Sequence, residues 1–297
     1  MLERCARVGA FLLLSLFSAA GASGAESAKV AASYEDAMID VRGYKLHFRI
    51  YRGGQDTVLL ESGFGYGAAE WDELAPRLRS TTGATIISYD RAGLGMSELP
   101  ERPYDVHEEV IGLHSGLLAL GRTRDVVLVG HSYGGYLIQL YANFHPENVR
   151  GLVYVDSNTI TGIDALNATK IADSLIRHND VPNPTQQQRA NLRAARGYPN
   201  AHETMRRYPV ICGVPVVVIT AGKKPQGLGT DAIDAWRRGH TELVSQSGGT
   251  RMFAEHSGHM VPFDQPDIII EAVRATLSSP LRNRPSLGSP NRTCAAS

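Results

Sequence analysis

The segment Gly130–Gly135, which reads GHSYGG, constrains the fold of this chain more than any other feature. It follows residues 125–129, a short apolar and β-branched run that predicts a buried strand, and it precedes residues 136–141, where apolar side chains recur at helical spacing. A G-x-S-x-G serine requires this order of strand, sharp turn and helix, and the flanking glycines let the two backbones approach closely. We therefore expect Ser132 at the tip of the turn as a candidate nucleophile; an ordinary glycine-rich turn is the alternative.

Apolar runs alternate with helical patterns along most of the chain. Continuous apolar runs predict buried strands, and an early run of alternating character predicts a half-exposed antiparallel strand. Because strands and helices alternate, we expect an α/β fold with a mostly parallel sheet of about eight strands and helices on both faces. The predicted strands cover residues 38–41, 45–51, 57–60, 85–89, 125–129, 152–155, 214–220 and 250–253, and the predicted helices cover residues 71–78, 104–120, 136–141, 232–243 and 267–277.

Three segments fall outside this alternation, so that the main domain is expected to span residues 26–277. Residues 1–25 join two arginines to an apolar stretch and small residues, which predicts a secretory signal peptide; an uncleaved anchor is the alternative. Residues 157–208 are more polar and lie between two predicted strands, so we expect a small inserted helical cap. Residues 278–297 are rich in Pro, Ser, Asn and Arg, which predicts a flexible tail.

Charge and cysteine content narrow the class of partner. Lys plus Arg number 30 and Asp plus Glu number 30, and no basic stripe stands out, which argues against nucleic acid or an anionic membrane as the main partner. Cys5 lies in the predicted signal peptide, and an exported location permits a disulfide between Cys212 and Cys294 without requiring it. His256 and His259 are three residues apart, but no further ligand falls at a metal-site spacing, so we expect no metal site.

A glycine-rich loop at residues 61–65 follows the predicted strand 57–60. Such a loop can offer a backbone N–H to an oxyanion that develops during acyl transfer. We nominate the N–H groups of Phe64 and Tyr133 as the two donors of an oxyanion hole. The alternative for the loop is an ordinary turn from strand to helix.

Asp90 follows the predicted strand 85–89 and offers another carboxylate. Its tight loop contains several backbone N–H groups and the neighbouring Arg91. We expect Asp90 to hold this loop through those groups rather than to take part in chemistry.

Four candidate site residues come directly after predicted strands: Phe64, Ser132, Asp156 and His259. In mostly parallel sheets the ligand site lies at the carboxyl ends of the strands, so these residues are expected to converge although they are far apart in sequence. The chain order Ser, Asp, His is the order of the catalytic triad in this kind of fold.

At four motifs the sequence resembles the α/β-hydrolase superfamily, and the resemblance extends over about residues 38–277. The motifs are LESGFG at 60–65, YDRAGLG at 89–95, GHSYGG at 130–135, and SGH at 257–259 followed by DQP at 264–266. In one departure, Glu61-Ser62-Gly63 stands where many members have His-Gly. Together the motifs are specific for the superfamily but not for a substrate, and the serine at position 132 excludes the members that use an aspartate nucleophile.

The resemblance implies that Ser132 is the nucleophile and that His259, rather than His256, is the base. Many members carry the triad acid shortly after the strand that corresponds here to residues 214–220, but residues 221–226 contain no carboxylate. Asp156 ends the preceding core strand, where some related hydrolases place their acid, and we nominate it. Asp231 and Asp234 remain open as alternatives, and Asp156 could instead cap the first helix of the inserted segment.

The mechanism implied by the resemblance is acyl transfer through an acyl-enzyme, with no metal or organic cofactor and a small molecule as substrate. A small to medium carboxylic ester is the expected substrate. Hydrolysis of a C–C bond, a lactone or an amide, and cofactor-free perhydrolysis, are alternatives for the same triad. A ligand-binding module without turnover is an alternative of another class, because fold does not determine function. The signal peptide predicts a periplasmic or secreted enzyme with no stable membrane insertion.

Overall fold

The computed structural model describes residues 34–225 and 227–280, and it contains an eight-stranded, mostly parallel sheet with helices on both faces. The predicted fold class is confirmed. The strand order is β1-β2-β4-β3-β5-β6-β7-β8. The strands are β1 (Glu35–Asp40), β2 (Lys45–Tyr51), β3 (Thr57–Glu61), β4 (Thr85–Asp90), β5 (Val126–His131), β6 (Val149–Val155), β7 (Val216–Ala221) and β8 (Thr250–Ala254).

The edge of the sheet at β1 and β2 is antiparallel, and the strands from β4 to β8 run parallel to one another. The tight turn between β1 and β2 places Arg42 and Gly43 at positive φ, a conformation that glycine adopts readily. The strands β3, β4 and β5 are buried along their whole length. Burial on both faces explains why their sequences are continuous apolar runs rather than alternating ones.

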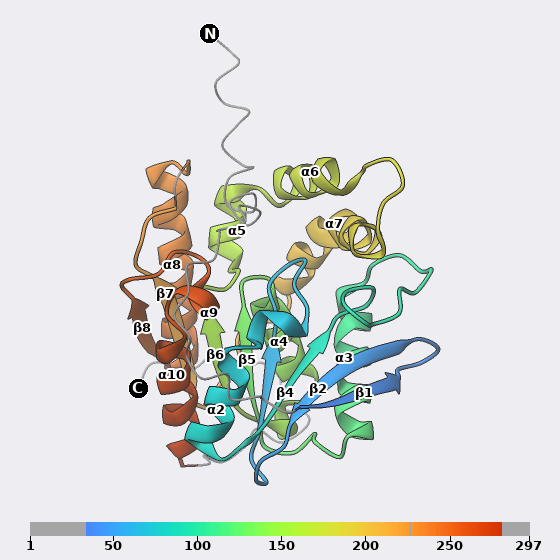
Figure 1. The fold of residues 1–297 in the computed structure, drawn as a ribbon. Helices are drawn as coiled ribbons and strands as arrows, with labels where there is room; N and C mark the ends of the chain where they lie inside the picture. The colour runs from blue at the N-terminus through green and yellow to red at the C-terminus, as the bar shows by residue number, and fades with distance from the viewer. Residues whose placement is uncertain (1–33, 226, 281–297) are drawn as a thin grey trace, which may run out of the picture.

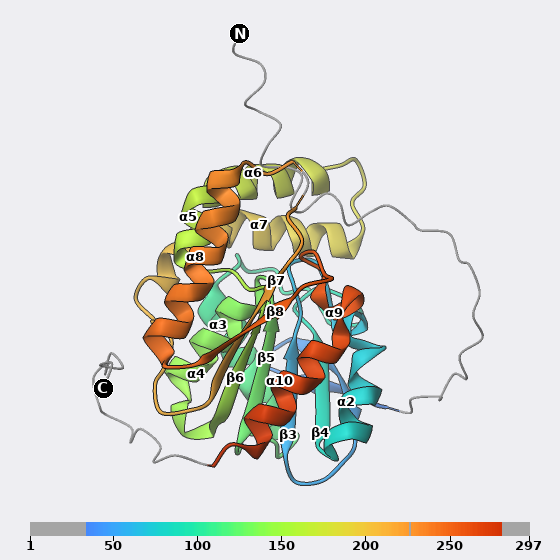
Figure 2. The ribbon, with the colours of Figure 1, turned by 90° about the vertical axis from the view of Figure 1, so that its left-hand side faces the viewer.

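Helices cover both faces of the sheet, as Figures 1 and 2 show. On one face, α2 and α10 pack against the strands; on the other, α3, α4 and α8 do so. The helix expected over residues 71–78 begins only at Leu74, because the preceding residues form the 3₁₀ turn η2 and the Trp71 indole donates to Ser62 Oγ at 2.9 Å. The helical segments of the main domain are η2 (Ala68–Trp71), α2 (Leu74–Thr82), α3 (Val106–Ala119), α4 (Gly134–Phe144), η3 (Pro146–Asn148), α8 (Thr230–Ser247), α9 (Val261–Asp264) and α10 (Pro266–Ser278).

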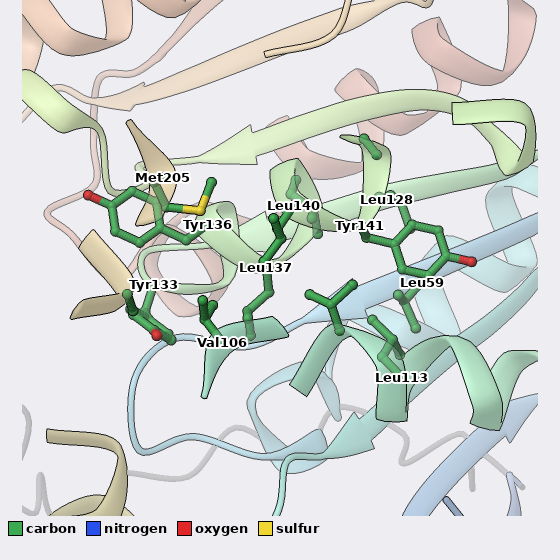
Figure 3. Close-up of a cluster of buried hydrophobic side chains, with 14 of the residues drawn as sticks. Leu59, Val106, Leu113, Leu128, Tyr133, Tyr136, Leu137, Leu140, Tyr141 and Met205 are labelled. Carbon is green, nitrogen blue, oxygen red and sulfur yellow. The ribbon is translucent and has the colours of Figure 1, made fainter. Parts of the chain in front are cut away.

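The hydrophobic core on the α3 and α4 face holds the helix that follows the GHSYGG motif. Figure 3 shows Leu137 and Leu140 of α4 lying between side chains of β3, β5 and α3, with Tyr133 and Tyr136 at one end of the cluster. Nine consecutive residues of α4, from Gly134 to Ala142, are buried. Burial of a side chain the size of leucine contributes about 1.5–3 kcal/mol, so this packing holds the start of α4 firmly against the sheet.

Strand register brings the loops of the candidate site together. Glu61 of β3 pairs with Gly130 of β5, and Gly130 pairs in turn with Tyr154 of β6. The loops that follow these three strands therefore begin side by side at the same edge of the sheet. The two strands that follow β3 in the chain, β4 and β5, lie on opposite sides of it in the sheet. This reversal of strand order is the topological switch point at which α/β sheets bind ligands, and it lies at the same edge.

The segment predicted to form a cap contains three helices: α5 (Ile160–Leu166), α6 (Ala168–Asn179) and α7 (Gln186–Met205). Figures 1 and 2 show them together beyond the carboxyl ends of the parallel strands. Their function as a cap stays a prediction. The predicted signal peptide and almost all of the predicted tail lie outside the described residues. Within residues 34–225 and 227–280, every helix is too short or too polar to span a bilayer.

Candidate active site

Ser132 lies on the sharp turn between β5 and α4. Its φ of 52° is in the left-handed region, which a non-glycine residue adopts only under strain. A Cβ at Gly130 would lie 2.7 Å from the Gly134 carbonyl oxygen, so the strand and helix approach as closely as the motif predicts. The Ser132 N–H donates to the Val155 carbonyl oxygen at 3.1 Å, which ties the turn to the end of β6.

Three candidate residues meet at this turn. His259 Nε2 lies 2.9 Å from Ser132 Oγ, and His259 Nδ1 lies 2.7 Å from Asp156 Oδ2. Because the Asp156 carboxylate accepts a hydrogen bond from Nδ1–H, the neutral imidazole has Nε2 free to accept the Ser132 proton. The structure thus brings together the serine, histidine and aspartate that the sequence nominated, in the geometry that a base-activated nucleophile needs.

Asp156 is buried and fully hydrogen-bonded. Its Oδ1 accepts hydrogen bonds from the Ala221 N–H at 3.0 Å and from the Trp236 indole N–H at 3.1 Å. Burial alone raises the pKa of Asp156, but the hydrogen bond and charge of His259, with His240 and the Ala221 N–H, lower this pKa to about 2. The carboxylate is therefore ionised at neutral pH.

The alternative residues lie elsewhere. Asp231 and Asp234 are exposed near the start of α8. His256 is also exposed, and its backbone N–H donates to Gln265 Oε1 at 3.0 Å. Within the described part of the chain, no hydrogen bond or ion pair joins these three side chains to Ser132 or His259.

The loop after β3 passes directly beside Ser132. A Cβ at Gly63 would lie 3.5 Å from Ser132 Cβ and 3.0 Å from His131 Nδ1, so only glycine fits there without a shift. Among the described residues, the backbone N–H groups of Phe64 and Tyr133 have no hydrogen-bond partner. Both are therefore available to an oxyanion beside Ser132, although a buried N–H without a partner is uncommon.

Asp90 holds its loop as predicted, but Arg91 does not take part in this. Asp90 accepts hydrogen bonds from the N–H groups of Met96 and Ala68 and contacts His47 Nδ1 at 2.8 Å. The Arg91 side chain instead turns toward the loop after β3, because the buried Glu61 carboxylate accepts from Arg91 Nη1 at 2.6 Å. A buried guanidinium needs such a carboxylate partner. Asp90 does not provide one, because both of its carboxylate oxygens already have other partners.

Sequence reasoning missed a second buried pair, His131 and Glu70. Glu70 Oε2 accepts the Gly63 N–H at 2.8 Å, Glu70 Oε1 contacts His131 Nδ1, and His131 Nε2 donates to the His259 carbonyl oxygen at 2.9 Å. Burial lowers the pKa of His131, but the Glu70 carboxylate raises it further, so the net direction is upward. The pair links the loop after β3, the turn at Ser132 and the loop of His259; the only sequence signal was a histidine inside the motif itself.

Among the cavities next to the site, one has Ser132 at its wall and another is much larger, and Phe64 lines both. The smaller, of about 30 Å³, contains Ser132 and His259 at its wall. The larger, of about 450 Å³, lies on the other side of Phe64, between the loops after β3 and β4 and helices α6 and α7. Three apolar residues of the predicted cap line the smaller cavity, namely Ile163, Leu166 and Ile171.

No group of three or more His, Cys, Asp or Glu side chains within residues 34–225 and 227–280 could hold a metal ion. The disulfide between Cys212 and Cys294, which the sequence permits without requiring, involves Cys294, which lies outside the described residues.

Comparison with known proteins agrees with the motifs and the topology. A profile of the Alpha/beta hydrolase family matches residues 58–272, which is more than half of the sequence. The chain therefore belongs to the Alpha/beta hydrolase family, and the resemblance inferred from its motifs is confirmed.

Individual relatives and solved structures are similar to this chain at low identity. YqjL of Bacillus subtilis, an uncharacterized protein, is 24% identical over 237 residues, covering 78% of this chain and 88% of YqjL. The esterase EaEST from Exiguobacterium antarcticum superimposes with a TM-score of 0.64 at 16% identity, covering 84% of this chain and 100% of the esterase. Est816, described as an N-acyl homoserine lactone degrading enzyme, superimposes with a TM-score of 0.62 at 18% identity, covering 80% of this chain and 99% of Est816. At these identities the two structures support the fold alone.

Proposed function

We propose that this protein is a serine hydrolase that cleaves small to medium carboxylic esters through an acyl-enzyme intermediate. The observation that carries the proposal is the unbroken chain of hydrogen bonds from Ser132 Oγ through His259 to Asp156, at 2.9 and 2.7 Å. A serine hydroxyl is a weak nucleophile until a base removes its proton, and this chain supplies the base together with the group that orients it.

In the first half of the reaction, His259 Nε2 takes the proton of Ser132 Oγ while the oxygen attacks the ester carbonyl carbon. Asp156 keeps the imidazole in the required tautomer and stabilises its cationic form. His259 then gives the proton to the leaving alcohol oxygen, and the acyl group remains on Ser132. In the second half, water repeats these steps, with His259 again as the base, and releases the carboxylic acid.

The negative charge that develops on the carbonyl oxygen needs donors already in position. The N–H groups of Phe64 and Tyr133 are the candidates, because both flank Ser132 and neither has another partner among the described residues. Removing one such donor typically lowers kcat by about 10²–10³-fold.

The lining of the cavity at Ser132 favours an uncharged substrate. Its wall is mostly apolar and includes Ile163, Leu166, Ile171 and Trp236. Apolar walls with a few placed polar groups favour neutral ligands. The structural likeness to an esterase and to a lactone-degrading enzyme is compatible with ester chemistry, and lactones are the natural second class to assay.

The test is turnover of p-nitrophenyl esters with acyl chains from acetyl to dodecanoyl, alongside a set of γ-lactones and anilides. We expect hydrolysis of the esters and covalent labelling by a fluorophosphonate. The Ser132→Ala variant is the matched control and should neither turn over nor label. An absence of both turnover and labelling in the natural chain would contradict the proposal and favour a binding module.

A further inference from the structure

The carbonyl of Gly63 and the N–H of Phe64 belong to the same peptide unit. This unit is planar, and no cis peptide bond occurs within the described residues. In a trans peptide, the C=O and the N–H point in opposite directions. Any group that holds the Gly63 carbonyl oxygen on one side of the loop therefore determines where the Phe64 N–H points on the other side.

Arg91 is the group that holds this carbonyl. Its Nη2 donates to the Gly63 carbonyl oxygen, and its Nη1 donates to the preceding carbonyl, that of Ser62, at 2.6 Å. The guanidinium thus grips two consecutive carbonyls of the loop after β3. Both Arg91 and the loop leave neighbouring parallel strands, β4 and β3, so the contact is built into the sheet.

Arg91 is itself held from behind. Glu61 accepts from Arg91 Nη1 at 2.6 Å and from the Tyr89 hydroxyl, and the side chains of Glu61 and Arg91 are 0% and 7% exposed. Five donors in one rigid planar fork let an arginine reach a carboxylate and two carbonyls together, whereas a lysine would have to bring all three acceptors to a single nitrogen. Glu61 belongs to Glu61-Ser62-Gly63, the segment that stands where many family members have His-Gly.

We propose that Arg91, anchored by Glu61, is a positioning residue for the oxyanion hole. It orients the peptide between Gly63 and Phe64 so that the Phe64 N–H faces the carbonyl oxygen of the substrate. A cation at the C=O end also polarises the peptide and makes its N–H a stronger donor. Arg91 touches neither the substrate nor Ser132; it acts through the backbone. This inference rests on the proposed acyl transfer at Ser132.

The effect should be confined to the transition state. A planar ester carbonyl makes weak demands on the oxyanion donors, whereas the tetrahedral intermediate carries a full negative charge on that oxygen. Misdirecting the Phe64 N–H therefore lowers kcat and leaves KM nearly unchanged. A merely structural role for Arg91 would change the stability of the fold without this separation.

The first experiment compares Arg91→Lys with Arg150→Lys in the hydrolysis of p-nitrophenyl butanoate. Arg150 also joins a carboxylate and a carbonyl, those of Asp56 and Leu277, but it does so at the start of β6, at the opposite edge of the sheet. We expect Arg91→Lys to lower kcat by about 10–100-fold with KM within about threefold, and Arg150→Lys to leave both unchanged. Equal kinetics for the two variants would overturn the proposal.

The second experiment measures inhibition by an alkyl trifluoromethyl ketone and by the matching methyl ketone. Ser132 Oγ adds to the fluorinated carbonyl, its proton passes to His259, and the ketone oxygen becomes an oxyanion. The methyl ketone stays planar and reports ground-state binding. In Arg91→Lys the inhibition constant of the fluorinated compound should rise by the same factor by which kcat/KM falls, with that of the methyl ketone constant; parallel changes in both would contradict an oxyanion role.

A double variant guards against loss of folding. Removing one member of a buried ion pair is strongly destabilising, whereas replacing both members is often tolerated. Glu61→Gln combined with Arg91→Met keeps an acceptor for Tyr89 but leaves the Gly63 carbonyl without its cation, and it should show the same selective fall in kcat. If the natural chain turns over no ester and takes no fluorophosphonate, the proposed function fails; if it does both and these variants match it, only the role of Arg91 fails.

Discussion

The Asp156 carboxylate meets the His259 imidazole across 103 residues of chain, with Oδ2 2.7 Å from Nδ1. Asp156 follows β6, and His259 lies in the loop between β8 and α9. Many family members carry the triad acid just after the strand that corresponds to β7, but here the end of β7 supplies a hydrogen-bond donor instead. The Ala221 N–H donates to the Asp156 carboxylate. The Asp156 carboxylate, which follows β6, is therefore held by the end of β7 as well.

We predict that Asp156→Asn lowers kcat by up to about 10⁴-fold, because an amide at this position favours the wrong imidazole tautomer. Asp231→Asn and Asp234→Asn are the matched controls, since both side chains are exposed on α8. Steady-state kinetics with p-nitrophenyl butanoate compare the three. Collapse of either control, with Asp156→Asn near the natural rate, would move the triad acid to α8.

Asp156 should also make stability depend on pH in the acid range. Its pKa in the folded protein is about 2, below the usual value of 3.8, so its contribution is complete above about pH 4 and is lost as pH falls toward 2. The shift corresponds to about 2 kcal/mol. Urea unfolding of the natural chain and of Asp156→Asn should give a stability difference that narrows by about two thirds of this amount between pH 5 and pH 2.5. A constant difference would contradict an ionised, hydrogen-bonded Asp156.

Ser132→Ala should lower kcat by about 10⁴–10⁶-fold and abolish labelling by a fluorophosphonate, because the attacking oxygen is lost. The far-UV circular dichroism spectrum should stay the same. Relief of strain does not enter this comparison, since alanine at φ 52° is as constrained as serine. Labelling that survives in the variant would place the nucleophile elsewhere.

His259→Ala should lose most of the turnover, whereas His256→Ala should keep most of it. His259 contacts both Ser132 Oγ and Asp156, and His256 is exposed on the same loop. The comparison controls for any disturbance of the loop, because the two histidines are three residues apart. Initial rates at saturating ester decide between them, and a reversed order would refute the assignment of the base.

Leu166→Ala should shift the preference toward longer acyl chains. The Leu166 side chain lines the cavity of about 30 Å³ at Ser132, and its truncation enlarges that cavity. A difference of one methylene in an apolar pocket is worth about 1–3 kcal/mol. The ratio of kcat/KM for p-nitrophenyl octanoate to that for p-nitrophenyl acetate is the measurement, with the exposed Leu118→Ala as control. A changed melting temperature with an unchanged ratio would contradict a role of the predicted cap in substrate choice and leave it a role in packing alone.

Local sequence pattern was sufficient to predict the fold class and the turn that carries Ser132. Continuous apolar runs identified the buried parallel strands, and the GHSYGG turn between a strand and a helix identified Ser132, because both depend on neighbours in the chain. Strand ends were less exact. The strand predicted at 152–155 begins at Val149, since polar Arg150 can stay at the sheet edge while its neighbours pair.

The contacts between distant segments could be decided only by the tertiary structure. The sequence nominated Asp156 but could not separate it from Asp231 and Asp234 by distance, because that depends on the register of β6 and β7. It assigned Arg91 to the loop of Asp90, whereas the neighbouring strand β3 offers a buried carboxylate and two carbonyls. Nor did it predict the Glu70–His131 pair, whose members are 61 residues apart. Periodicity and turn chemistry are local properties of the chain, but the partner of a buried charge is selected by whichever group the packed sheet brings within hydrogen-bonding distance.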